Sequence, residues 1–193
     1  MNDEARKIRQ TRSIASEFKT RQEGEALKIE GYFAVFNSNY DIAPGMSESI
    51  APGAFKNTLA GDIRALVNHD TTLVLGRTSA HTLDLREDEH GLWGSIDINP
   101  KDSDAMNLYE RVKRGDVSQC SFGFDILSEE TEIRDNGEVH WTMNEVKLYE
   151  VSCVTFPAYE STNIDARSKE REDILKREND AWRAKMKERI SKC

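Results

Sequence analysis

Short segments rich in β-branched and aromatic residues recur along most of the chain, separated by turn-forming residues. Such segments are typical of β-strands. We predict strands at residues 11–19, 26–37, 63–69, 73–78, 82–87, 92–99, 118–128 and 139–155, the first of them an edge strand. Residues 42–53 carry two prolines and two glycines and predict a loop, followed by a single helical turn at 55–60. A closed or nearly closed β-barrel accommodates many short strands better than an open sheet, because closure leaves no bare edges.

One segment has the pattern of an α-helix, residues 103–114. Its apolar residues recur on one face at helical spacing: Ala105, Leu108, Tyr109 and Val112. Asp102 or Ser103 can cap its start, and Gly115 can close its end. The fold class we expect is therefore mainly β with α (α+β), a barrel with peripheral helices.

The C-terminal part of the chain differs from the rest in charge. Residues 165–193 hold 10 Lys+Arg and 7 Asp+Glu, a net charge of +3. The whole chain carries −8, so residues 1–164 carry −11. Apolar residues in the tail lie at multiples of four, which favours an amphipathic helix: Ile174, Trp182, Met186 and Ile190. We predict a disordered segment at 1–11, a barrel domain at 12–165 and a charged helical tail at 166–193.

Composition also argues against several classes of partner. An acidic protein repels phosphate backbones, so we expect no nucleic acid partner. No stretch approaches the ~20 apolar residues of a membrane helix, and the charged start does not resemble a secretory signal, so we expect a cytoplasmic protein. The spacings of Cys120, Cys153 and Cys193 match no zinc pattern, which favours free thiols. We expect no metal and no cofactor.

The segment VSQCSFGFD contains a candidate nucleophile. As a strand it places Cys120, Phe122 and Phe124 on one face, and Ser121 and Gly123 on the other. The glycine leaves room for another backbone or a substrate to approach. A serine nucleophile needs such access and a nearby base. The alternative is a half-exposed strand with a small polar solvent face, and this segment alone favours that alternative.

A base and an orienting group are available elsewhere. His69 ends the strand predicted at 63–69, and its unperturbed pKa near 6.5 suits proton exchange. Glu150 is a charge within the apolar segment LYEVSCVTFPAY, where a carboxylate needs a partner. It could orient an imidazole, although an ion pair at the barrel rim is at least as common. His81, His90 and His140 lie near polar turns and are interpreted as surface residues.

Several segments, in order, resemble the tailed-bacteriophage prohead (capsid maturation) protease family, which is related to herpesvirus assemblin. They are IEGYFAVFN, ESIAPGAF, NHD, LGRT, GLWGSIDI, SFGF and EVSCVTFPAY, and the resemblance covers roughly residues 12–165. A single short motif such as NHD would recur by chance, but the ordered set is specific. The resemblance implies the barrel of that family and a serine protease.

The resemblance also implies site residues. The family's histidine falls on His69 and its serine on Ser121. Herpesvirus relatives use a second histidine, which EVSCVTFPAY lacks, so Glu150 is our third member and His140 the reserve. Cys120 is a rival nucleophile, but strand alternation puts it on the face opposite Ser121.

Cys120 and two further residues, Cys153 and Arg77, are interpreted as structural. We read Cys120 as core packing on that opposite face, and Cys153 likewise. Arg77 in LGRT could help bind an oxyanion or the substrate, and an ordinary ion pair is the better interpretation.

The function that the resemblance implies is a serine endopeptidase of capsid maturation. It would cleave the scaffold, the scaffold-like delta segment of the major capsid protein, and itself. It would act in the host bacterial cytoplasm inside the prohead and use backbone amides as the oxyanion hole. A homodimer is among the partners that we expect. The alternative is a catalytically inactive assembly scaffold of the same fold. A ligand-binding barrel fits the fold equally well but leaves the ordered motifs unexplained.

Overall fold

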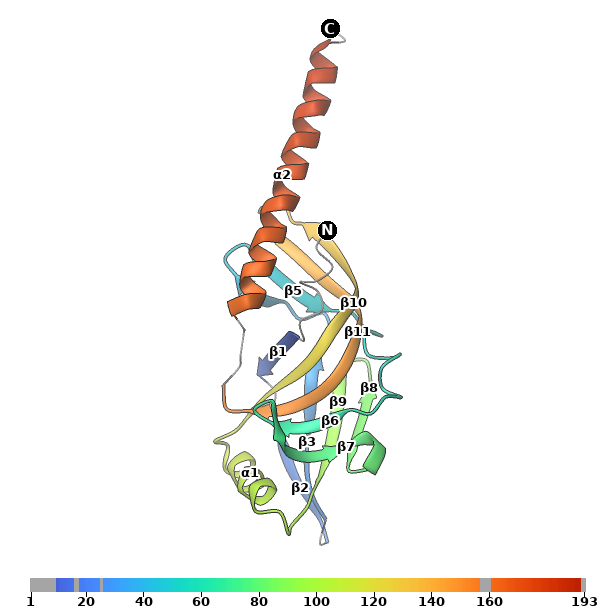
Figure 1. The fold of residues 1–193 in the computed structure, drawn as a ribbon, viewed down its shortest axis with the longest axis vertical. Coiled ribbons are helices and arrows are strands. Elements are labelled where there is room, and N and C mark those ends of the chain that lie inside the picture. Colours follow the sequence, from blue (N-terminus) through green and yellow to red (C-terminus); the bar gives the residue numbers. More distant parts are fainter. Residues whose placement is uncertain (1–9, 16–17, 25, 157–160, 192–193) are drawn as a thin grey trace.

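The computed structural model describes residues 10–15, 18–24, 26–156 and 161–191 (Figure 1). Its strands are β1 Gln10–Ala15, β2 Lys19–Glu23, β3 Ala26–Val35, β4 Tyr40–Ala43, β5 Met46–Ile50, β6 Arg64–Val67, β7 Asp70–Arg77, β8 Leu83–Glu87, β9 Gly91–Ile98, β10 Gln119–Ile133 and β11 Val139–Val154. The helices are α1 Ser103–Arg114 and α2 Ser161–Ser191, with a short 3₁₀ turn at Thr78–Ala80.

The larger sheet is organised around β11. The strand order is β1-β10-β11-β5-β4, and β6 and β7 are attached through β11 as well. β10 and β11 form a long antiparallel pair. The first part of β11 pairs in parallel with β5, and its last part pairs in parallel with β6. One strand therefore joins its hairpin partner β10 to β5 and β6, two segments that lie far earlier in the sequence.

The smaller sheet is antiparallel, with the order β2-β3-β9-β8. A single hydrophobic cluster lies between the sheets and includes fully buried side chains from both, among them Phe33, Leu92, Ile96, Phe122 and Phe124. Burial of these apolar surfaces is the main force that holds the sheets together. The Cys120 thiol donates to the Tyr32 carbonyl oxygen (3.1 Å), which also brings β10 against β3.

The helix α1 has the bounds that the sequence predicts. Asp102 Oδ1 accepts hydrogen bonds from the backbone amides of Asp104 (2.9 Å) and Ala105 (3.3 Å). Gly115 ends the helix with a left-handed φ of 88°, a conformation that glycine adopts at no steric cost. The predicted apolar face is buried.

The mainly β architecture with helices is confirmed, but part of the prediction is not. Neither sheet closes on itself among the strands described, so the barrel stays a prediction. The loop predicted at 42–53 is wrong, because β4 and β5 form a hairpin there with Pro44 and Gly45 as its turn. The turn-forming residues are confined to the hairpin tip, while every residue of β5 is buried. Residues 52–60 form a run of turns rather than a helix.

Two segments that are far apart in the chain, β1 and the start of α2, meet at Glu48 of β5. The Arg12 guanidinium pairs with its buried carboxylate, with Nη2 3.0 Å from Oε2. Arg167 of α2 lies 4.0 Å from the same Oε2, forms a forked pair with Glu129 (2.6 and 3.1 Å), and stacks on the Trp141 ring. The start of α2 is thus fixed to the larger sheet.

Farther along, α2 leaves the sheets and projects away from them (Figure 1). Ile174 and Leu175 still pack on the small cluster around Trp141. Beyond them nearly every residue is exposed, including Trp182 (59%) and Ile190 (75%). No helix in the described ranges is long and apolar enough to span a membrane.

The boundaries predicted for the domains remain predictions. The structure begins β1 at Gln10, so Gln10 and Thr11, which we predicted in a disordered segment, lie in a strand. Residues 1–9 lie outside the described residues, as do 157–160 near the predicted end of the barrel domain.

Candidate active site

His69 lies in a tight turn rather than in the strand predicted at 63–69. β6 ends at Val67 and pairs with Asp70, the first residue of β7. The two residues between them, Asn68 and His69, both have left-handed φ values of 50° and 62°. Positive φ at both central residues is the signature of a type I′ hairpin turn, a conformation that is uncommon for non-glycine residues and that asparagine and histidine adopt more often than most. Strained backbone of this kind concentrates at functional sites.

Asn68 anchors this turn to β11. Its backbone amide donates to the Cys153 carbonyl oxygen (3.0 Å), and its side-chain oxygen accepts from the Thr155 backbone amide (2.9 Å). The neighbouring His69 is therefore held at a fixed place beside the last residues of β11.

The imidazole of His69 is hydrogen-bonded to Glu150. His69 Nδ1 lies 2.7 Å from Glu150 Oε1, and the Glu150 side chain is only 2% exposed. A carboxylate accepts only, so Nδ1 carries the proton and Nε2 of the neutral ring carries the lone pair. Nε2 is buried and has no hydrogen-bond partner among the described residues. This tautomer is the one that can accept a proton.

Glu150 occupies space that Gly123 leaves open. The two residues are direct partners across the β10–β11 pair. A Cβ atom on residue 123 would lie 2.3 Å from Glu150 Oε1. The second carboxylate oxygen, Oε2, accepts from the Ser152 hydroxyl at 2.7 Å. The space that we predict for another backbone or a substrate is therefore filled by the Glu150 side chain instead.

Ser121 lies on the same sheet face as these groups. It is paired with Ser152 directly across the β10–β11 ladder, two residues from the Gly123–Glu150 pair. Its side chain is fully buried, and its hydroxyl donates to the Arg12 carbonyl oxygen (2.8 Å) on β1. In this arrangement Ser121 and His69 are not hydrogen-bonded to each other. The serine is nonetheless not on a solvent face, which was the alternative for this segment.

The sequence profile of the caudovirus prohead serine protease family matches residues 15–177. The chain belongs to this family. It is similar to the prohead protease of Enterobacteria phage HK97, with 34% identity over 155 residues that make up 78% of this chain. The chain spans 64% of the length of that relative. The resemblance drawn from the ordered motifs is confirmed.

The chain is also similar to a solved structure, that of the capsid assembly protease of bacteriophage T4. The similarity has a TM-score of 0.46 and 14% sequence identity, and it covers 76% of this chain and 99% of the T4 chain.

The two described cysteines of this family member lie in the core. Cys120 and Cys153 both belong to the main hydrophobic cluster, as predicted. Burial raises the pKa of the Cys153 thiol to about 12, which keeps it protonated at neutral pH. Cys120 lies on the face opposite Ser121, where it contacts the backbone of β3 rather than His69.

His140 is buried, so its interpretation as a surface residue is wrong. It lies on β11 between β5 and β10, a position that its polar flanking sequence did not indicate. Nδ1 contacts the Ser47 hydroxyl (2.7 Å) and Nε2 contacts the Ser49 hydroxyl (2.9 Å). Desolvation by burial lowers the pKa of His140. Serines of β5 thus contact both ring nitrogens of His140.

The remaining polar candidates are exposed. His81 and His90 lie at the surface, as predicted. Arg77 forms an ion pair with Asp62, also as predicted, and this pairing lowers the pKa of Asp62 to about 2. Within the described part of the chain, no cluster of three or more His, Cys, Asp or Glu side chains could hold a metal ion.

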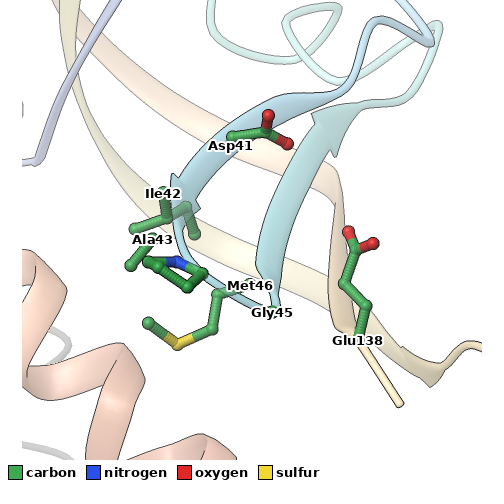
Figure 2. Close-up of a pocket in the computed structure, with 7 residues that line it drawn as sticks. Asp41, Ile42, Ala43, Gly45, Met46 and Glu138 are labelled. Carbon is green, nitrogen blue, oxygen red and sulfur yellow. The ribbon is translucent and has the colours of Figure 1, made fainter. Parts of the chain in front are cut away.

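A surface hollow of about 380 Å³ lies at the β4–β5 hairpin and not at this site (Figure 2). It is lined by Asp41, Ile42, Ala43, Pro44, Gly45, Met46 and Glu138. None of its lining residues belongs to the Ser121, His69 and Glu150 set.

Ser152 is the member of the site that the sequence analysis missed. The available signal was its spacing, since it lies two residues after Glu150 and therefore on the same face of the strand.

Proposed function

We propose that this chain is a serine endopeptidase in which Ser121 is the nucleophile, His69 the general base and Glu150 the group that orients His69. The observation that supports this most is the 2.7 Å contact between His69 Nδ1 and Glu150 Oε1, with Nε2 left free of hydrogen bonds to the described residues. Membership of the prohead serine protease family supports the same assignment.

The proposed chemistry follows the arrangement of these groups. The Ser121 hydroxyl leaves the Arg12 carbonyl, transfers its proton to His69 Nε2, and Oγ attacks the carbonyl carbon of the scissile peptide bond. The ionised Glu150 stabilises the imidazolium that forms. His69 then gives the proton to the leaving amine, the peptide bond breaks, and an acyl-enzyme remains. Water, deprotonated by His69, hydrolyses the ester and restores the Ser121 hydroxyl.

The proposed substrates are the scaffold, the delta segment of the major capsid protein, and the protease itself. We place the reaction in the host bacterial cytoplasm, inside the prohead, and a homodimer is part of the proposal. The similarity to a prohead protease supports a role in capsid assembly. We include neither nucleic acid nor membrane among the partners.

The test uses the purified full chain and the capsid protein precursor of the same phage. We expect discrete fragments, with sites located by mass spectrometry, and labelling of Ser121 by a fluorophosphonate probe. Ser121→Ala should abolish both. Cys120→Ala is the matched control, because it changes the adjacent residue on the opposite face, and it should keep cleavage and labelling. Activity lost in Cys120→Ala but kept in Ser121→Ala would reject the assignment.

The second candidate function is an inactive assembly scaffold of the same fold. One observation favours it: the Ser121 hydroxyl is fully buried and engaged by the Arg12 carbonyl. This candidate predicts that the protein enters proheads while the precursor stays intact and the fluorophosphonate probe does not react.

A further inference from the structure

The proposed mechanism leaves one buried hydroxyl of the site without a role. Ser152 is fully buried and lies directly opposite Ser121 on the neighbouring strand. Its Oγ donates to Glu150 Oε2 (2.7 Å) and accepts from the backbone amide of His69 (3.2 Å). A single hydroxyl thus contacts both partners of the His69–Glu150 pair.

We infer that Ser152 is a positioning residue of this site, which fixes the Glu150 carboxylate and the His69 turn relative to each other. The inference rests on the proposed function for its catalytic meaning. Ser152 acts only through its two neighbours and is not assigned any contact with substrate.

Ser152 acts on one of the two carboxylate oxygens of Glu150. Oε1 accepts from the imidazole and Oε2 accepts from Ser152, so each oxygen of this buried group has a donor. Without the Ser152 hydroxyl, Oε2 would lack this donor in a site with almost no solvent. The carboxylate would then rotate to find another donor and would take Oε1 away from Nδ1.

Ser152 also holds the backbone of the strained turn at His69. His69 has a φ of 62°, a conformation that a non-glycine residue keeps only when its surroundings hold it. Its amide donates to Ser152 Oγ, a bond from the strained residue itself to the strand that carries Glu150. Ser152 therefore helps to fix the position of the His69 backbone, which carries the imidazole, and the position of the Glu150 carboxylate.

The protonation of the cluster is consistent with this role. The directions of both hydrogen bonds of Ser152 are fixed, because an ionised carboxylate only accepts and a backbone amide only donates. The Ser152 proton therefore points to Glu150, and a lone pair points to His69. Both capacities of the hydroxyl are used, which distinguishes Ser152 from a serine that merely fills space.

The test compares three variants at this position with one control. Ser152→Ala and Ser152→Cys remove the strong hydroxyl donor, and the cysteine keeps the volume so that the fold survives. Ser152→Thr keeps the hydroxyl. The control is Ser49→Ala, which also removes a buried serine hydroxyl bonded to a histidine ring, that of His140.

Two readouts separate positioning from simple stability. With the capsid precursor as substrate, Ser152→Ala and Ser152→Cys should lower kcat on the order of 10–100-fold with little change in KM. Ser152→Thr should recover most of it, and Ser49→Ala should not change it. By nitrogen-15 NMR, His69 of the wild type should be protonated on Nδ1. In the alanine and cysteine variants the two tautomers of the ring should mix, since the carboxylate is no longer held beside Nδ1.

The NMR readout needs no proteolysis. A wild type that cleaves nothing would count against the proposed function, whereas a His69 tautomer unchanged in Ser152→Cys would overturn the positioning role. An equal loss of kcat in Ser49→Ala would also overturn it, because the effect would then be general destabilisation.

Discussion

Gly123 and Glu150 face each other across two adjacent strands, and the carboxylate occupies the place where a side chain on residue 123 would begin. The serine two residues before this glycine, Ser121, is the proposed nucleophile. The Ser-Phe-Gly spacing on β10 therefore places a small residue beside the Glu150 carboxylate and a hydroxyl two pairs farther along the ladder.

Replacing Gly123 by alanine should displace Glu150 Oε1. We expect kcat to fall at least about tenfold, with a loss of about 1–3 kcal/mol in unfolding free energy from overpacking. Gly115→Ala is the control, because it strains a left-handed position but meets no atom within 4 Å. It should lose stability and keep kcat. Equal kinetics in the two variants would show that the space at residue 123 does not matter for catalysis.

Replacing Glu150 by glutamine keeps the shape of the side chain and removes its charge. We expect a folded protein whose kcat falls on the order of 10²–10⁴-fold while KM changes little, because the carboxylate matters most when the imidazole is charged. Steady-state kinetics with the capsid precursor, and circular dichroism for the fold, measure this. Unchanged kinetics would remove Glu150 from the site.

The buried Arg12–Glu48 pair should contribute to stability far more than an exposed one. Glu48→Ala leaves the Arg12 guanidinium in a buried place without this carboxylate, and we expect a loss of about 3–5 kcal/mol in urea unfolding. Asp62→Ala breaks the exposed pair with Arg77, and no measurable loss is expected. Similar losses for both would mean that Glu48 is not the anchor of the β1 edge.

His140 should make stability depend on pH. Burial lowers its pKa in the folded state, the charge of Arg134 acts in the same direction, and Glu138 and Glu132 oppose them. The unfolded chain therefore binds the proton more readily. The stabilisation is present above the unfolded pKa near 6.5 and is lost as pH falls through it toward the folded value.

Urea midpoints between pH 7.5 and 5.5 measure this effect. The wild type should lose stability toward pH 5.5, and His140→Gln should show a shallower slope. His81→Gln, a change at the surface, should keep the wild-type slope. A slope unaffected by His140→Gln would assign the dependence to other groups.

We propose that the exposed part of α2 serves assembly rather than catalysis. Truncation after Leu175 keeps the contacts of Arg167 and the packing on Trp141, so the protein should fold, cleave, and fail to enter proheads. Truncation after Ala166 removes these contacts and should cost about 3 kcal/mol or more. If truncation after Leu175 abolished cleavage in a protein that still folds, a role confined to assembly would be contradicted.

Local signals explain what the sequence could predict. The helix α1 is specified by its own apolar spacing, its Asp102 cap and its terminal Gly115, and its bounds are confirmed. The core position of Cys120 follows from strand alternation, which places it on the same face as Phe122 and Phe124. The ordered motifs were specific enough to identify the family.

Non-local pairing explains what the sequence could not predict. The polar β5 is buried because Glu48 meets Arg12, which lies 36 positions away in the chain. His140 is buried because serines of β5 accommodate both ring nitrogens. The sequence predicts a strand at 63–69 and does not reveal the hairpin turn at His69. The left-handed backbone of this turn depends on contacts with β11. None of these contacts leaves a pattern within a short window of sequence.

The central place of β11 has a consequence for when the site can exist. His69 and Glu150 are 81 positions apart, and Glu150 reaches its place only when β11 pairs with both β10 and β6. Pairings of such long sequence separation form slowly, since a large loop must close first. A ribosome-bound chain that has exposed both His69 and Ser121 still lacks the carboxylate and the Ser152 hydroxyl. Until β11 has been synthesised and paired, a nascent chain therefore lacks the complete site that we propose for catalysis.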